Sequence, residues 1–162
     1  MRIHILAAFA ALALALTANP AFAQPVTSER DDVERVESSD PEMNAAIETA
    51  QQTLPDFLAM LADPPRGVSQ IGFKFPLGGW EHIWVHDVRR DGDYLTGRLS
   101  NVPMQEEWKQ NERVRVPLSE VSDWAWMDAD GVMRGQHTTR VLLSRIDPQM
   151  AAAIAESFGW KR

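Results

Sequence analysis

Cysteine is absent from this chain of 162 residues, and basic residues are scarcer than acidic ones. The absence of cysteine excludes disulfide bonds, thiolate zinc sites and a cysteine nucleophile. With 16 Lys and Arg against 23 Asp and Glu, the formal net charge is −7. Binding to DNA or RNA requires a basic surface that replaces counterions, so this charge argues against nucleic acid as a partner. The length suits one modest domain, alone or with a tail.

Sequence motifs of several enzyme classes are also absent. The chain has no Gly-x-Ser-x-Gly nucleophile elbow, no Ser-x-x-Lys pair and no Walker-type phosphate loop. Carboxylates for glycoside cleavage are present at Glu81, Glu106, Glu107 and Asp123, but sequence spacing brings no two of them to a working separation. The motifs therefore name no activity, and no cofactor is expected.

The first 23 residues have the pattern of a secretory signal peptide. After a positively charged start, residues 3–18 are almost wholly apolar, and Ala21 and Ala23 place small residues before a cleavage point. The apolar run is short for a membrane span, and no later run approaches the required length. We expect cleavage between Ala23 and Gln24, a periplasmic or secreted location, and no membrane span after cleavage. An uncleaved anchor is the alternative.

Residues 24–40 are predicted to be a flexible acidic leader. They contain six acidic residues, two arginines and few apolar side chains, so they have too little apolar surface to offset the entropy of ordering. A partner-binding arm is the alternative interpretation. Residues 41–162 then form a single globular domain, which is long enough for one hydrophobic core. Without disulfides, this core must stabilise the domain by itself. We expect the protein to be a monomer.

Helix signals lie at both ends of the domain. Asp40-Pro41 and Asp147-Pro148 each combine an N-cap acid with proline in the first turn, and apolar residues at helical spacing follow. Pro55 ends or kinks the first helix, and Thr53 is a predicted N-cap of a second. Gly159 ends the last helix.

From residue 69 the apolar residues alternate, which predicts consecutive antiparallel strands. Pro117 indicates a sheet edge or a strand end, and residues 137–146 fit either a strand or a short helix. The order predicts an α+β fold, with N-terminal helices, a curved antiparallel sheet of about five to six strands or a half-open small barrel, and a C-terminal helix. The predicted strands are residues 71–75, 81–88, 94–99, 113–118, 124–126 and 132–136.

His82 and His86 have the spacing of a helical metal site, but the local pattern is that of a strand. Four residues of a strand span roughly 13 Å. Two imidazoles so far apart do not share one ion at bonding distance, so no metal site is predicted. We expect both histidines on a partly solvated face with Trp84, and Ile83 and Val85 on the other face.

All six tryptophans follow residue 79. Exposed tryptophan stacks on sugars or anchors partners, whereas buried tryptophan fills a small core. Trp84 and Trp124 are expected in or near the core, with groove lining as the alternative. Trp108 lies in a polar stretch and is the tryptophan expected to be exposed.

Four segments occur in a characteristic order: Glu81-His-Ile-Trp-Val85, Gly97-Arg-Leu-Ser-Asn101-Val-Pro103, Val121-Ser-Asp-Trp124 and Gly135-Gln-His-Thr138-Thr-Arg140-Val-Leu142. With the helical segment before them, they resemble the YegJ-like family of bacterial proteins, a domain of unknown function, over residues 40–145. The resemblance implies a small, often exported domain, and it implies no activity or cofactor. The positions that match the family pattern are Glu81, Trp84, Asn101, Pro103, Asp123, Trp124, Thr138 and Arg140.

These positions, apart from Pro103, are the candidate binding residues. They form either a ligand cleft or a buried network that braces the fold, and we favour bracing. Arg140 is expected to pair with Asp123 or Glu81, because its planar guanidinium holds a carboxylate through two bonds. The leading hypothesis is an exported, non-catalytic binding or accessory module for an envelope protein or a small ligand. The alternative is a cell-envelope hydrolase that acts on peptidoglycan or a peptide, with Glu81 or Asp123 as acid or base.

Overall fold

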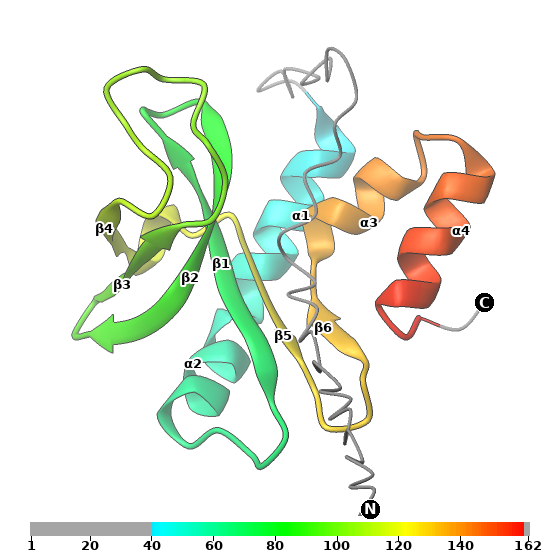
Figure 1. The fold of residues 1–162 in the computed structure, drawn as a ribbon, viewed down its shortest axis with the longest axis horizontal. Coiled ribbons are helices and arrows are strands. Elements are labelled where there is room, and N and C mark those ends of the chain that lie inside the picture. Colours follow the sequence, from blue (N-terminus) through cyan, green and yellow to red (C-terminus); the bar gives the residue numbers. More distant parts are fainter. Residues whose placement is uncertain (1–39, 161–162) are drawn as a thin grey trace, which may run out of the picture.

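Two helices precede a six-stranded sheet and two follow it (Figure 1). The computed structural model describes residues 40–160; the expected signal peptide and almost all of the acidic leader lie outside them. The elements are α1 (Pro41–Gln52), α2 (Leu54–Ala62), β1 (Ser69–Leu77), β2 (Glu81–Asp91), β3 (Tyr94–Leu99), β4 (Arg113–Pro117), a 3-10 turn (Leu118–Glu120), β5 (Asp123–Met127), β6 (Met133–Gly135), α3 (His137–Leu143) and α4 (Pro148–Ser157).

The α+β fold predicted from the pattern is confirmed. The strand order is β4-β3-β2-β1-β5-β6, with every neighbouring pair antiparallel. Pro117 closes β4, which is an edge strand, as proline predicts. The ambiguous segment 137–146 begins as helix α3, so two helices rather than one end the chain.

Side-chain caps form at two of the three predicted positions. Asp40 accepts hydrogen bonds from the amides of Glu42 and Met43, both at 3.1 Å, and Asp147 caps α4 in the same way. Thr53 is the N-cap residue of α2 as predicted, but its side chain makes no cap hydrogen bond. The Thr53 hydroxyl donates backwards to the carbonyl of Thr49 at 2.6 Å, so it completes the end of α1 instead of starting α2.

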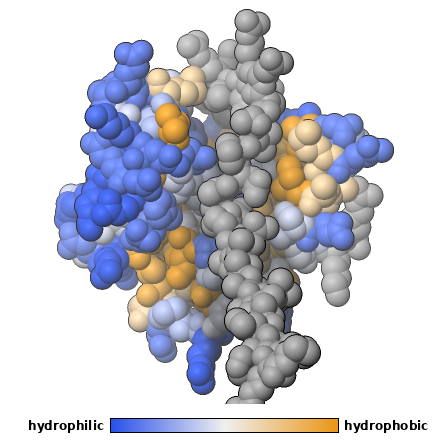
Figure 2. Space-filling model, in the orientation of Figure 1, coloured by the Kyte–Doolittle hydropathy of each residue, from blue (hydrophilic) through white to orange (hydrophobic). Residues whose placement is uncertain are grey.

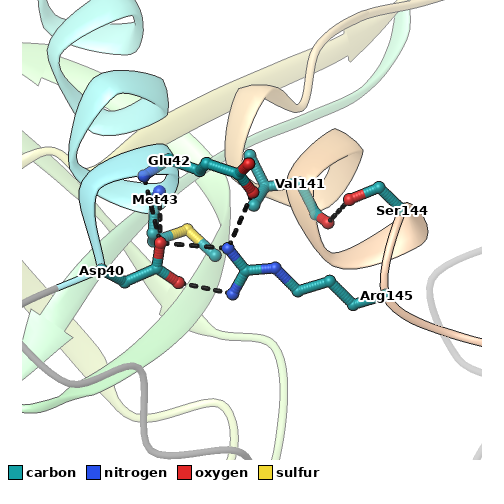
Figure 3. A network of polar contacts seen from close by, with 6 residues as sticks. All are labelled: Asp40, Glu42, Met43, Val141, Ser144 and Arg145. Atoms are coloured by element: carbon teal, nitrogen blue, oxygen red, sulfur yellow. Dashed lines mark hydrogen bonds and ion pairs between the residues drawn. The ribbon is translucent and has the colours of Figure 1, made fainter.

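The start of α1 is tied to the end of α3 by one arginine (Figure 3). The Arg145 guanidinium binds both carboxylate oxygens of Asp40 and also reaches Glu42 at 3.1 Å. Arg145 and the Met43 amide together lower the pKa of Asp40 to about 2. The N-cap of α1 therefore stays charged at neutral pH and also serves as an anchor for α3.

The core lies between α1, α2 and one face of the curved sheet. On β1 the side chains of Phe73 and Phe75 point to this face, and the Phe57 ring of α2 stacks on Trp124 with centroids 5.8 Å apart. The indole N–H of Trp124 donates to the carbonyl of Ala50 at 2.9 Å. Large aromatic side chains thus supply the stability that a cysteine-free domain needs.

Apolar atoms are unevenly distributed over the surface seen in Figure 2. The β2–β3 half of this face is largely hydrophilic, and apolar atoms gather over α2 and beside α3 and α4. Within residues 40–160, no helix combines the length and the apolar character needed to cross a membrane.

Candidate functional site

A row of three side chains crosses the middle of the sheet on the face opposite the aromatic core. Lys74 of β1 is the cross-strand partner of Trp84 on β2 and of Asp123 on β5. Directly opposed residues in antiparallel strands share a face. The Lys74 ammonium lies 4.8 Å from the centroid of the Trp84 ring, within the range of a cation–π contact.

The Asp123 carboxylate is fully buried at 0% exposure and accepts four hydrogen bonds. One oxygen accepts from the amides of Trp124 at 2.9 Å and His137 at 3.1 Å. The other accepts from the amide of Thr138 at 2.8 Å and from its hydroxyl at 2.6 Å. Asp123 therefore binds the N–H groups at the start of α3, where a negative charge is favourable.

Thr138 connects the buried acid to the buried base. Its hydroxyl donates to Asp123 and accepts a hydrogen bond from the Lys74 ammonium at 2.7 Å. Lys74 is 6% exposed and Thr138 2%. The three side chains form a continuous chain, Lys74 to Thr138 to Asp123, in which each polar group has a partner.

Burial lowers the pKa of Lys74, and the charge of Asp123 opposes that change. Burial also lowers the pKa of His82, with a further contribution from the Lys74 charge. The His82 ring bonds the Ser122 hydroxyl at 2.8 Å, whereas the His86 ring bonds the Ser100 hydroxyl at 3.2 Å. The two histidines thus contact different hydroxyl groups.

This chain of contacts fits a brace better than a reaction centre. A reaction centre must bring its acid or base to the substrate, and here the carboxylate has no exposed surface. The arrangement is a buried polar network that fixes α3 to β1 and β5. Of the predicted site residues, Trp84, Asp123 and Thr138 meet here. Lys74 was missed, because its place in an alternating Phe-Lys-Phe run reads as a solvated position.

Lys74→Met should change how stability depends on pH. Because the folded state lowers the pKa of Lys74 below its usual 10.5, the unfolded chain binds more protons between the lowered pKa and 10.5. Unfolding free energy contributed by this lysine therefore rises with pH across that window. Urea titrations at a series of pH values should show the wild-type free energy rising relative to that of Lys74→Met. Lys109→Met, at an exposed position, is the control; a flat difference for Lys74→Met would contradict the prediction.

Of two other predicted residues, Glu81 begins β2 and reaches the loop after β3 with its side chain, and Asn101 lies on that loop. Glu81 accepts hydrogen bonds from the amide of Met104 at 2.8 Å and from the side chain of Gln105 at 3.2 Å. Gln105 in turn donates to the carbonyl of Leu77 at 2.9 Å. Glu81 therefore joins the β1–β2 turn to the loop, while Asn101 is exposed on that loop.

The expected ion pair of Arg140 is wrong. Arg140 makes no ion pair with Asp123 or Glu81, and its guanidinium lies over the Trp160 ring, 3.5 Å from the centroid. The side chain is exposed. The partner expected for Asp123 is thus supplied by Lys74 through Thr138, from a strand that lies far away in sequence. Trp124, the last predicted site residue, belongs to the core.

Three large apolar side chains are exposed on the β1–β2 turn and on the loop after β3, the two segments that Glu81 connects. Trp80 is 49% exposed, Met104 53% and Val102 75%. Trp108, the tryptophan expected to be exposed, instead packs against the core, because its loop folds back on the sheet. The sequence feature that indicates an exposed Trp80 is its position directly after Gly78-Gly79, at the tip of a turn.

A cavity of about 450 Å³ lies next to this turn. Its lining comes from the end of β1, the β1–β2 turn, the loop residue Trp108, β4 and the 3-10 turn. Among the residues the structure describes, no group of three or more His, Asp or Glu side chains is placed to hold a metal ion.

Comparison with known proteins places the chain in a family. A family model described as "Uncharacterized protein conserved in bacteria (DUF2314)" matches residues 40–161. The chain is also similar to a protein of Neisseria meningitidis serogroup B that carries the name of an ankyrin repeat protein, with 31% identity over 119 residues. This match covers 66% of the chain and 47% of the relative, so the chain spans about half the relative's length. No solved structure matches. The chain belongs to the DUF2314 family of uncharacterised proteins conserved in bacteria.

Proposed function

We propose that the chain is an exported, non-catalytic binding module of the bacterial cell envelope. Export follows from the signal-peptide pattern of the first 23 residues, with cleavage between Ala23 and Gln24 and release into the periplasm. The module acts as a monomer on an envelope protein or a small ligand, and not on nucleic acid, since the net charge is −7. Within its family, the ordered motifs around Glu81 and Arg140 favour the YegJ-like group.

The observation that carries this proposal is the exposed apolar rim formed by Trp80, Val102 and Met104. Large apolar side chains that stay exposed on two connected segments are typical of interaction surfaces, and tryptophan is enriched among residues that dominate binding energy. Glu81 bonds the backbone at Met104 and so fixes the loop to the turn that carries Trp80. A binding surface that is already ordered in the free protein loses less conformational entropy on binding.

The printed name of the Neisseria relative is consistent with a binding role. Ankyrin repeats stack into extended surfaces that bind other proteins. The part similar to this chain covers less than half of that relative. We infer that the domain works as a module that can accompany a binding domain.

The alternative, a hydrolase that acts on peptidoglycan or a peptide, has less support. It requires Glu81 or Asp123 to act as acid or base on a substrate. Both oxygens of Asp123 are occupied by buried donors, and Glu81 is engaged by Met104 and Gln105. These donors occupy the oxygen atoms that an acid or base would have to present to a substrate.

One experiment in a Gram-negative host tests the export and the binding surface together. A photo-crosslinking amino acid replaces Trp80 in the full chain, and in a second strain it replaces Asp130, which is exposed on a different turn. After illumination, we expect a discrete adduct from position 80 and none from position 130. The uncrosslinked protein recovered from the periplasm should have the mass of a chain that begins at Gln24.

Two outcomes would contradict the proposal. Equal adducts from positions 80 and 130 would show that the rim around Trp80 is not a binding surface. A mass that still includes residues 1–23 would show that the apolar segment is a retained anchor rather than a cleaved signal. The adduct itself, analysed by mass, distinguishes a protein partner from a small ligand.

A further inference from the structure

Two stretches of strand that have an open side line the same cavity. β4 is the end strand of the sheet and pairs only with β3. The pairing of β1 with β5 ends at Lys74, which lies opposite Asp123. Within residues 40–160, the last part of β1, from Phe75 to Leu77, therefore has a neighbouring strand, β2, on one side only. Curvature of the sheet brings these two stretches to the same cavity of about 450 Å³, which both of them line.

The lining shows that the cavity runs along an edge rather than over a face. Arg113, Val114, Arg115 and Val116 are consecutive in β4, and all four contact it. Successive side chains of a strand point to opposite faces, so only a space along the strand's open side meets all four. The cavity therefore follows the open side of β4, and we call this strip between β4 and the end of β1 the seam.

The open side of β4 carries backbone groups that are free to pair. The carbonyl of Glu112 accepts from the amide of Leu99 in β3, and the amide of Leu118 donates to the carbonyl of Asp93, directly before β3. In an antiparallel pair the backbone groups of alternate residues point to alternate sides, so the amides of Arg113 and Arg115 point away from β3, into the seam. On the open stretch of β1, Pro76 has no amide hydrogen to offer. β4 is thus the edge that can accept another strand.

The chemistry of the seam selects its occupant. Phe75, Leu77 and Trp108 contribute apolar side chains to its lining. Arg113 on the rim makes no ion pair with any described residue, whereas Arg115 is paired with Asp91 at 2.8 Å. A second copy of this chain would bring two arginine-bearing edges together, which repel one another. The seam therefore fits an extended segment of a different protein that carries an acidic residue opposite Arg113.

We propose that an extended, acidic-apolar segment of a partner protein adds to β4 as a seventh strand and fills this cavity. Strand addition of this kind obtains affinity from main-chain hydrogen bonds and specificity from pockets for alternate side chains. The inference rests on the proposed binding function and names the form of its partner. The seam lies next to the turn that carries Trp80, because Gly78 and Gly79 of that turn line the cavity.

The test uses a fluorescein-labelled peptide of alternating valine and glutamate, six residues long, and the purified chain that begins at Gln24. Fluorescence anisotropy measures its dissociation constant for the wild type, Arg113→Ala and Arg113→Pro. Alanine removes the charge, and proline removes the charge and the outward amide. Because proline is tolerated at the first residue of an edge strand, Arg113→Pro should fold. Its urea midpoint verifies this.

We expect the peptide to bind the wild type, and Arg113→Pro to bind roughly 3–10-fold more weakly than Arg113→Ala, the value of one hydrogen bond. A peptide N-methylated at alternate residues, which lacks the matching donors, should not bind. Equal affinity of the two variants, or of the two peptides, would overturn strand addition. Absence of peptide binding with a position-80 adduct in cells overturns strand addition alone; absence of both overturns the binding function as well.

Discussion

Asp123→Ala is expected to lower the free energy of unfolding by about 3–5 kcal/mol. The substitution leaves the buried ammonium of Lys74 without its counter-charge. It also leaves the amides of His137 and Thr138, which donate to the carboxylate in the wild type, without an acceptor. A donor buried without an acceptor has lost its hydrogen bonds to water and gained none in the protein, so the folded state carries its full desolvation penalty. Urea unfolding followed by tryptophan fluorescence measures the loss.

Asp130→Ala serves as the control for this prediction, because Asp130 is exposed on the β5–β6 turn. A surface substitution of this kind usually changes stability by within about 0.5 kcal/mol. Amide hydrogen exchange provides a second measurement. If Asp123 fixes α3, the amides of His137 and Thr138 should lose protection from exchange in Asp123→Ala. This loss should occur at denaturant concentrations where the amides of β2 and β3 stay protected. A loss below about 1 kcal/mol would refute the bracing role.

Gly135→Ala is expected to destabilise the domain by about 3 kcal/mol or more, an exceptional value for a single methyl group. A Cβ at this position would overlap the carbonyl oxygen and the indole ring of Trp124 on the neighbouring strand. That carbonyl accepts the amide of Gln136 at 2.9 Å, so moving it breaks a further hydrogen bond. The φ of Gly135 is +73°, which adds backbone strain to the overlap.

Gly131→Ala separates these two effects. Gly131 has a nearly identical φ of +76°, yet a Cβ there meets nothing within 4 Å. Its alanine variant should therefore lose only about 1 kcal/mol, the cost of the left-handed conformation. Thermal unfolding of both variants at one protein concentration provides the comparison. Equal losses would mean that contact with β5 contributes nothing at Gly135.

The elements could be predicted where local chemistry decides them. The Asp40 and Asp147 caps and the alternation in β2 are properties of a few adjacent residues, and the structure confirms them. Thr53 misled because its hydroxyl had a closer acceptor one turn back. Segment 137–146 was ambiguous because three β-branched residues in it suit a strand, and its helical start depends on Asp123, which is distant in sequence.

The site was harder to predict because its members meet only through tertiary structure. Trp84, Asp123 and Thr138 were named because they match the family pattern, but nothing local shows that Lys74 lies between them. The charge of Arg140 made it the natural partner, yet its position on α3 turns it towards Trp160. The cavity beside β4 is likewise a property of sheet curvature, which arises where residues with positive φ such as Asp87 interrupt the pairing.

The position of β1 between β2 and β5 determines when the domain can fold. The hairpins from β1 to β4 form between neighbours in the chain, whereas the Lys74–Thr138 contact joins residues 64 positions apart and the Gln51–Leu118 contact joins residues 67 apart. Closing loops of this length slows folding. A chain that lacks β5 and α3 therefore has β1 paired on one side only and Lys74 uncovered, and we expect the docking of β5 to be the rate-limiting step. Folding is therefore complete only once the C-terminal third of the chain, which contains β5 and α3, is available to pack on β1.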